Sequence, residues 1–353
     1  MKDPGTAGLA TWASTICGEA IPAEGVLPIG GSGNSRVYRV ETSGKPLALK
    51  HYHRHEGDPR DRQGTEFAAF QVLRAGGITC VPEPVAMDRR LGTALYSFLE
   101  GVPLAEGARD SDVRQAVAFL QALQELARRV DLGAHAPASF ARFTLEDLLS
   151  NLALRRNLLG DRPPEPSLAP EYLQLQVFLD RQFEPALGAF ARQAAGAFGP
   201  TGILEVGSQT FGPSDFAFHN AIRQPEGTVA FFDFEYFGRE DPVKIIADFI
   251  LHPRPKLQEG LKALFRTLAL EAFPGHQVLE ARLDLLSPLF GLSWCLIILN
   301  EFTPAGLARR QFALGAEGVT ARRELLARKL AMARELLNHL QHHPQADPWP
   351  PAP

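Results

Sequence analysis

The segment SQTFGPSDFAFHNAIRQPEGTVAFFDFEYFG, from Ser208 to Gly238, places two aspartates and an asparagine among aromatic and aliphatic residues. Asp215 and Asn220 have the spacing D-x-x-x-x-N, and Asp233 follows in the next apolar run. Phosphoryl transfer requires Mg²⁺ held by hard oxygen ligands, and a carboxylate that orients the attacking hydroxyl and accepts its proton. For that chemistry, Asp215 would meet the hydroxyl while Asn220 and Asp233 hold the metal.

Asp and Asn are also common in ordinary turns, so this spacing needs support from other elements in the right chain order. Upstream, the run GGSGNSRVYRV leads from glycines into a β-branched strand. Its backbone N–H groups could approach phosphates closely, although a simple glycine-rich hairpin would have a similar sequence. The residues predicted to cover the phosphates are Gly30, Gly31, Ser32, Gly33 and Asn34.

Two charged residues follow in the order that a phosphate site needs. Lys50 ends the apolar strand PLALK and could pair with phosphates, and Glu66 on the next predicted helix could fix that lysine. Taken alone, a lysine at a strand end is usually solvated. The order glycine run, Lys, Glu, Asp, Asn, Asp favours a kinase-like site over coincidence.

The pattern of predicted elements changes near residue 100. Before it, strands are expected at 34–42, 45–53 and 93–101, with a helix at 64–77 between the second and third. After it come two short strands, 220–223 and 228–234, joined by the turn QPEG. The remaining segments have helical apolar spacing at 112–130, 145–159, 171–195, 256–273 and 321–341. A small β-rich lobe and a larger helical lobe are therefore expected.

From about Leu27 to Leu251 the sequence resembles the aminoglycoside phosphotransferase and choline kinase superfamily. The resemblance is carried by GGSGNSRVYRV, LALK, Glu66, YSFLEG, SDFAFHN and FFDFEYFGREDPVKIIADF. It implies an α+β, bilobal, protein-kinase-like fold. We expect an N-terminal nucleotide-binding lobe at residues 1–100, of which 1–26 form an extension. A helical lobe with the catalytic and metal loops is expected at 101–343, and a proline-rich tail at 344–353.

The resemblance also implies further site residues. ATP would lie between the lobes, with adenine against the backbone near Tyr96, Phe98 and Glu100, and Glu235 would add a contact to the metal. Asp241 would brace the loop that follows.

Two positions depart from the family pattern. Pro213 stands where a loop-supporting His is often found, with Ser214 before the catalytic Asp, so the geometry of the loop is in question. Arg36 stands where a protein kinase has the third glycine of its loop, but small-molecule kinases of the superfamily often carry an Asn in the loop, as Asn34 here, which favours the small-molecule branch.

These observations predict an ATP- and Mg²⁺-dependent kinase that phosphorylates a hydroxyl of a sugar, an aminosugar or an amino alcohol. The alternative is an inactive nucleotide-binding pseudokinase or scaffold, motivated by Pro213 and Ser214. A protein kinase is disfavoured, because the short segment from Asp233 to Asp241 leaves no room for a peptide-docking segment.

Other histidines offer weaker hypotheses. His51, His53 and His55 alternate and could bind Zn²⁺ on one strand face, but an exposed strand end is favoured since no fourth ligand is near. His219 is expected to pack or hydrogen-bond within the catalytic loop.

Composition narrows the class of protein. The 353 residues carry a net charge of -4 and 45% hydrophobic residues, which favours a globular protein and gives no general attraction to nucleic acid. No signal peptide or membrane-spanning run is expected, and the run 291–302 is interpreted as a buried helix. Three scattered cysteines predict neither disulfides nor a metal site. A cytoplasmic protein without a membrane or an obligate protein partner is the expectation.

Overall fold

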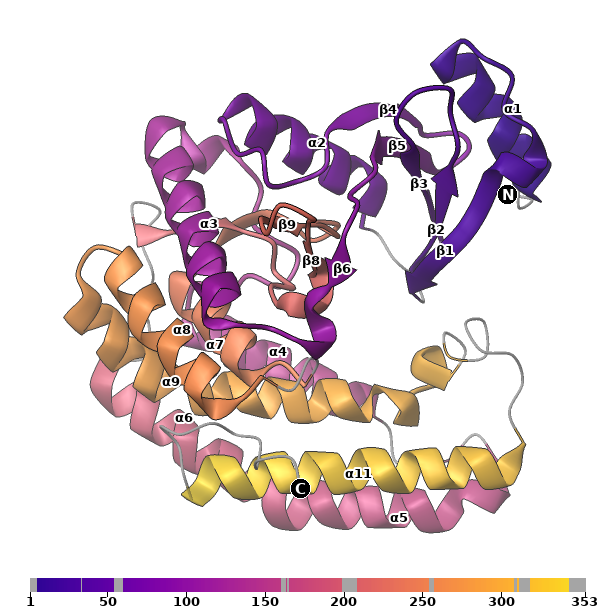
Figure 1. Ribbon diagram of the computed structural model, residues 1–353. Helices are drawn as coiled ribbons and strands as arrows, with labels where there is room; N and C mark the ends of the chain where they lie inside the picture. Colours follow the sequence, from indigo (N-terminus) through magenta and orange to yellow (C-terminus); the bar gives the residue numbers. More distant parts are fainter. Residues whose placement is uncertain are drawn as a thin grey trace.

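The computed structural model describes residues 5–32, 34–53, 60–159, 163, 165–198, 208–253, 257–307, 310 and 318–342. It has a small lobe built on an antiparallel sheet and a larger, mostly helical lobe (Figure 1). The predicted α+β bilobal fold is confirmed. The proline-rich tail at 344–353 lies outside the described residues.

The sheet of the small lobe has five strands in the order β1-β2-β3-β5-β4. The strands are β1 (Val26–Ser32), β2 (Ser35–Val40), β3 (Leu47–Tyr52), β4 (Pro84–Asp88) and β5 (Thr93–Ser97). Three were predicted; β1 lies in the glycine-rich run and β4 begins at a proline, so both lack the usual strand signal. The register shift between Pro28 and Gly30 marks the same irregularity.

Alternation along the strands gives the sheet two different faces. Tyr38, Val40, Leu49 and Leu95 pack on one face beneath helix α1 (Gly5–Cys17), where they form a separate small core. The opposite face carries Ala48, Lys50, Ala94 and Tyr96 and joins the main core. Lys50 therefore points toward the helical lobe.

Helix α2 (Arg62–Ala75) connects β3 to β4 and covers this second face. Asp61 caps its start, since its side chain accepts a hydrogen bond from the backbone N–H of Gly64. Glu66 lies in the second turn of the helix and is buried against the sheet. The cap and the apolar residues on the same face thus fix where this carboxylate lies.

The chain passes from one lobe to the other between Ser97 and Val102. Strand β6 (Val102–Pro103) pairs with β8 (Ala221–Arg223) of the larger lobe. At Gly101, φ is +149° and an added Cβ would lie 2.3 Å from the backbone oxygen of Arg223. Any side chain at this position would separate the connection from the larger lobe.

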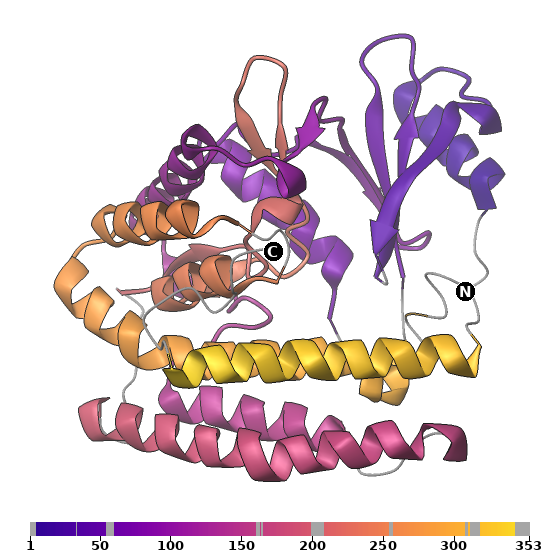
Figure 2. The ribbon, with the colours of Figure 1, turned by 60° about the horizontal axis from the view of Figure 1, so that its bottom comes forward.

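The larger lobe packs its helices around α9 (His276–Ile298), which contacts α4, α6, α7 and α11. Its helices are α3 (Asp110–Arg129), α4 (Leu145–Leu158), α5 (Ala169–Phe178), α6 (Glu184–Phe198), α7 (Pro242–Leu251), α8 (Glu259–Ala272), α9 and α11 (Val319–His342). The single helix predicted at 171–195 is two helices joined by a π-helical turn, Leu179–Phe183. Figure 2 shows α11 extending beneath both lobes beside α5.

Residues Gln277–Phe302 are long and apolar enough to cross a membrane, with a mean hydropathy of 1.6. The helix contains Glu280, Arg282 and Asp284, so it is not an uninterrupted apolar run of the kind that the sequence was expected to lack. Moreover, 61% of the apolar 18-residue stretch within this segment is buried inside the structure. Leu289, Leu292 and Leu299 of the segment are fully buried. The segment is the core helix of the larger lobe, which agrees with the interpretation of 291–302 as buried.

Candidate active site

Two nested pairs of short strands bring the predicted loops together. Strands β8 and β9 (Val229–Phe231) form the inner hairpin, and β7 (Thr210–Gly212) pairs with β10 (Gly238–Glu240) outside it. Asp215 follows β7 and Asp233 follows β9. The backbone N–H of Phe232 donates to the backbone oxygen of Asn220 at 3.0 Å, which ties the two loops directly.

Both loops contain a residue in an unusual backbone conformation. Ser214 has φ +65° and Asp233 has φ +67°, and they are the non-glycine residues with positive φ in the described part of the chain. Such a conformation costs of order 1–3 kcal/mol and often occurs at functional sites. Here each case redirects the chain at a predicted site residue.

Lys50 is the centre of a buried group of charges between the lobes. Its Nζ lies 2.6 Å from Oε2 of Glu66, 2.5 Å from Oδ1 of Asp233 and 3.7 Å from Oε2 of Glu235. Glu66 also accepts hydrogen bonds from the Tyr52 hydroxyl and from the backbone N–H of Phe234. The structure thus forms the predicted pair of Lys50 and Glu66 and adds both acids of the metal loop to it.

Glu235 joins the glycine-rich run to the metal loop. The side-chain amide of Asn34 donates to Oε1 of Glu235 at 2.9 Å and to the Tyr236 hydroxyl oxygen at 2.8 Å. Arg62 Nε lies 3.4 Å from the same Oε1. The side chain of Asn34 therefore links the glycine-rich run to the loop that carries Glu235 and Tyr236.

The charges of this Lys50 cluster (Lys50, Glu66, Asp233, Glu235) favour an added cation. Three carboxylates converge on Lys50, and Glu66, Asp233 and Glu235 offer oxygens within 4.8 Å of one another. Desolvation, with repulsion from Asp233, raises the pKa of Glu66 to about 7 and raises that of Glu235, although Lys50 acts in the opposite direction.

The donor set of this cluster fits Mg²⁺, because Mg²⁺ prefers carboxylate and amide oxygens. Oε2 of Glu235 is buried without a hydrogen-bond partner among the described residues. Asn220 is buried on the neighbouring loop, and its side-chain amide N–H donates to the backbone oxygen of Asp215. Asp233 and Glu235 thus offer oxygens that suit the metal, whereas the predicted role of Asn220 as a further ligand stays a prediction.

Asp215 is surrounded by imidazoles instead of carboxylates. Its Oδ2 lies 3.4 Å from Nε2 of His219, and its Oδ1 lies 3.4 Å from Nε2 of His252. The side chain of Asp215 is 32% exposed, so it can be reached from solvent. Desolvation acts to raise its pKa, but the hydrogen bonds and charges of His219 and His252 outweigh it and hold the pKa well below the ordinary value.

The position of Pro213 and Ser214 is supported from the following helix. Lys244 Nζ lies 3.4 Å from the backbone oxygen of Ser214, and it pairs with Asp248 at 2.6 Å and with Glu240 at 3.4 Å. These contacts support the loop before Asp215 without a histidine at position 213.

Asp241 braces the start of the same helix. Its side chain accepts from the backbone N–H of Val243 and pairs with Arg282 at 2.7 Å. This contact lies after the metal loop, where the resemblance placed it.

The residues predicted near adenine lie at the connection between lobes. Tyr96 is buried, and its hydroxyl group meets that of Tyr52 at 2.8 Å, so its side chain supports Glu66. The guanidinium of Arg39 lies 4.6 Å from the centre of the Phe98 ring and pairs with Glu100 at 2.8 Å. Contact of this backbone with adenine stays a prediction.

The glycine-rich run is described in part. Gly30, Gly31 and Ser32 end β1, whereas Gly33 lies outside the described residues. An added Cβ at Gly31 would lie 2.5 Å from the backbone oxygen of Ser35, so this turn requires glycine. Its role in covering phosphates stays a prediction.

The alternative metal site is also only partly described. His51 lies at the end of β3 and His53 follows that strand. His55 lies outside the described residues, so the hypothesis of a three-histidine site stays untested.

Sequence patterns missed four residues of the site: Arg62, Tyr236, His252 and Trp294. Each lies in an ordinary sequence context, with His252 directly after an apolar helix. Tyr236, in the metal loop, could have been noticed from its place next to Glu235. The others reach the site only through tertiary packing.

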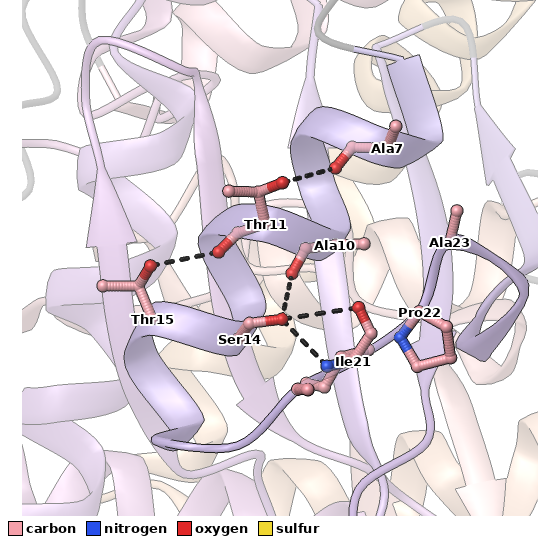
Figure 3. Close-up of a pocket in the computed structure, with 9 residues that line it drawn as sticks. Ala7, Ala10, Thr11, Ser14, Thr15, Ile21, Pro22 and Ala23 are labelled. Carbon is pink, nitrogen blue, oxygen red and sulfur yellow. Dashed lines mark hydrogen bonds between the residues drawn. The ribbon is translucent and has the colours of Figure 1, made fainter.

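A separate surface hollow lies beside α1 (Figure 3). Small or apolar residues line it, and the hydroxyl of Ser14 is engaged by the backbone of Ala10 and Ile21. Its lining contains no ionisable side chain. It therefore offers none of the acids, bases or metal ligands found between the lobes.

A model described as the phosphotransferase enzyme family matches residues 25–277. No curated protein matches the sequence significantly.

Several solved structures share the fold at low sequence identity. The gentamicin complex of APH(2")-IIa has a TM-score of 0.59 and 13% identity, covering 93% of this chain and 96% of that one. Spectinomycin phosphotransferase APH(9)-Ia, in complex with ADP and spectinomycin, has a TM-score of 0.55 and 9% identity, covering 92% of each chain. Choline kinase from Cryptosporidium parvum has a TM-score of 0.55 and 15% identity, covering 86% and 90%.

Proposed function

The chain belongs to the phosphotransferase enzyme family, and from this premise we propose that it transfers the γ-phosphoryl group of ATP to a hydroxyl of a small molecule, with Mg²⁺. The predicted resemblance and the predicted enzyme class, a phosphotransferase, are confirmed by the family match. ATP, Mg²⁺ and the kind of acceptor are the parts that we propose.

The observation that carries the proposal is the separation of two kinds of carboxylate. Asp233 and Glu235 lie among other acids and beside Lys50, an arrangement that suits a metal ion and phosphates. Asp215 is half-buried on the neighbouring loop and lies between His219 and His252. A phosphoryl donor and a hydroxyl acceptor need this division of roles.

In the proposed reaction, the backbone of Gly30 to Asn34 covers the phosphates. Lys50 must leave Asp233, its 2.5 Å partner here, to meet them. Asn220, Asp233 and Glu235 would hold the metal, which when bound neutralises charge on the phosphate oxygens.

Asp215 aligns the acceptor hydroxyl. The hydroxyl oxygen forms a bond to the γ-phosphorus, the bond from phosphorus to the bridging oxygen of ADP breaks, and the hydroxyl proton passes to Asp215. Because the pKa of Asp215 is lowered, its carboxylate is a weak base. We therefore assign it chiefly to orienting the hydroxyl and to accepting the proton late in the transfer.

We propose a sugar, an aminosugar or an amino alcohol as the acceptor. The printed names of structural neighbours include gentamicin, spectinomycin and choline kinase, which supports this range. Asp215 adds a carboxylate on the proposed acceptor side, and a cationic group of the acceptor would complement it.

The test is an ATP-consumption screen over sugars, aminoglycosides and amino alcohols, with Asp215→Asn as the matched control. We expect at least one compound to stimulate ADP release by the wild type but not by the variant, and a phosphorylated product to accumulate. Tight binding of Mg²⁺ATP with no acceptor found would instead support the pseudokinase.

A further inference from the structure

The carboxylate of Asp215 is contacted from two separate parts of the chain. His219 belongs to the same loop, within the turn Phe218–Asn220, whereas His252 directly follows α7. Their Nε2 atoms lie 3.4 Å from different oxygens of the carboxylate. Each oxygen of Asp215 therefore has its own imidazole partner.

The two imidazoles support one another. Their rings are stacked, with centres 4.3 Å apart and planes 13° apart. Trp294 of α9 packs its ring edge-on to His252, with centres 4.6 Å apart, and its indole N–H donates to Asp248 at 3.1 Å. Helices α7 and α9 thus fix His252, and His252 fixes the ring of His219.

An ionised carboxylate can only accept hydrogen bonds, so each imidazole nitrogen must present an N–H to it. One contact would leave the carboxylate free to rotate, but contacts on both oxygens define the plane of the group. A misplacement of about 1 Å can cost on the order of a hundredfold in rate. Restraint of the carboxylate plane would therefore favour transfer, because this carboxylate orients the hydroxyl.

We propose that His252, acting with His219, is a positioning residue that holds the Asp215 carboxylate toward the acceptor hydroxyl. The inference rests on the proposed function. His252 lies 37 positions after Asp215. It would give the carboxylate a support that the side chain of Pro213, which stands in place of the usual histidine, cannot give.

A shared metal ion is the competing explanation, because the three side chains offer ligand atoms within 4.8 Å of one another. The stacked rings disfavour it. An imidazole nitrogen binds a metal through a lone pair in the ring plane, and two nearly parallel planes cannot both contain one ion. The rings would have to turn out of their stack.

The kinetic test compares His252→Ala with His252→Gln, which keeps an N–H donor. We expect His252→Ala to lower kcat about tenfold while the KM for ATP changes less than twofold, and His252→Gln to recover most of the loss. The matched control is His135→Ala, because His135 also packs edge-on against an aromatic ring, that of Phe211. We expect this control to keep the wild-type kcat.

An unchanged kcat in His252→Ala would overturn the inference. So would a glutamine variant no better than alanine, with equal losses in kcat and in affinity for ATP, since that result indicates damage to the fold. Zn²⁺ binding by the wild type that disappears in His252→Ala would assign the cluster to metal binding and would also overturn it.

A second measurement separates this inference from the proposed function. In a double-mutant cycle, chemical denaturation compares Asp215→Asn, His252→Ala and the variant with both changes. We expect the two effects on unfolding to be non-additive, because the side chains are in contact. Additive effects would overturn the inference even if no acceptor is ever found, whereas non-additive effects without any transfer would count against the function alone.

Discussion

The Lys50 cluster and the surroundings of Asp215 both contain carboxylates, but the neighbouring charges differ. Glu66, Asp233 and Glu235 crowd around Lys50, and the pKa of Glu66 is raised to about 7. Asp215 instead faces His219 and His252, and its pKa is lowered. The first cluster gains from an added cation, whereas the second already holds its carboxylate as an anion. Neighbours, and not residue type, therefore give the two aspartates different electrostatic surroundings.

The largest expected effect comes from exchanging the two aspartates for asparagine. Asp215→Asn should lower kcat by on the order of a hundredfold or more and leave the affinity for Mg²⁺ATP nearly intact. Asp233→Asn should weaken Mg²⁺-dependent nucleotide binding as well as turnover, because an amide is a poorer ligand for a hard cation. Titration of Mg²⁺ATP into both variants, with turnover measured alongside, checks the comparison. Equal losses of nucleotide affinity in the two variants would contradict separate roles for Asp215 and Asp233.

An intermediate effect is expected from Lys50→Ala, measured as a change in melting temperature. Mg²⁺ATP should raise the melting temperature of the wild type by mass action, and the variant should lose most of that shift. Without ligand, the free energy of unfolding of the variant should fall by about 3 kcal/mol or less, because Glu66 can take up a proton when Lys50 is removed. Equal ligand-induced shifts in wild type and variant would remove Lys50 from the phosphate site.

The smallest effect on activity is expected at Glu240, which belongs to a second buried group of lysine and acids. Lys244 pairs there with Glu240 and Asp248, and Glu240 is fully buried. This group resembles the Lys50 cluster in composition but lies behind the loop that carries Asp215. We expect Glu240→Gln to change kcat by about twofold or less.

The pH dependence of stability should respond more clearly at this position. Desolvation raises the pKa of Glu240 above its ordinary value of 4.5. The folded protein therefore keeps a proton that the unfolded chain loses, and stability falls as the pH rises above about 4.5. Glu240→Gln should remove the contribution of Glu240 to this decrease in stability. Chemical denaturation at a series of pH values measures it. A steeper fall in the variant would mean that the ion pair with Lys244 dominates.

The sequence predicted most of the fold because the signals were local. The helices at 112–130 and 145–159 correspond to α3 and α4, since their apolar spacing defines one buried face. The hairpin predicted around QPEG corresponds to β8 and β9. Strand β1 was missed since glycines occupy it, and α5 and α6 were joined since a π-helical turn keeps the helical period nearly continuous.

The same locality explains what the sequence determined about the site. Asp215, Asn220 and Asp233 were identified because one short segment carries them with a characteristic spacing, and Lys50 and Glu66 because strand and helix patterns predict their elements. Tertiary structure alone decided their partners. His252 meets Asp215 because α7 folds back over the catalytic loop, and Asn34 meets Glu235 because the lobes close on each other across 201 residues of sequence. Such contacts depend on packing between elements distant in the chain, which leaves no periodicity or spacing in the sequence.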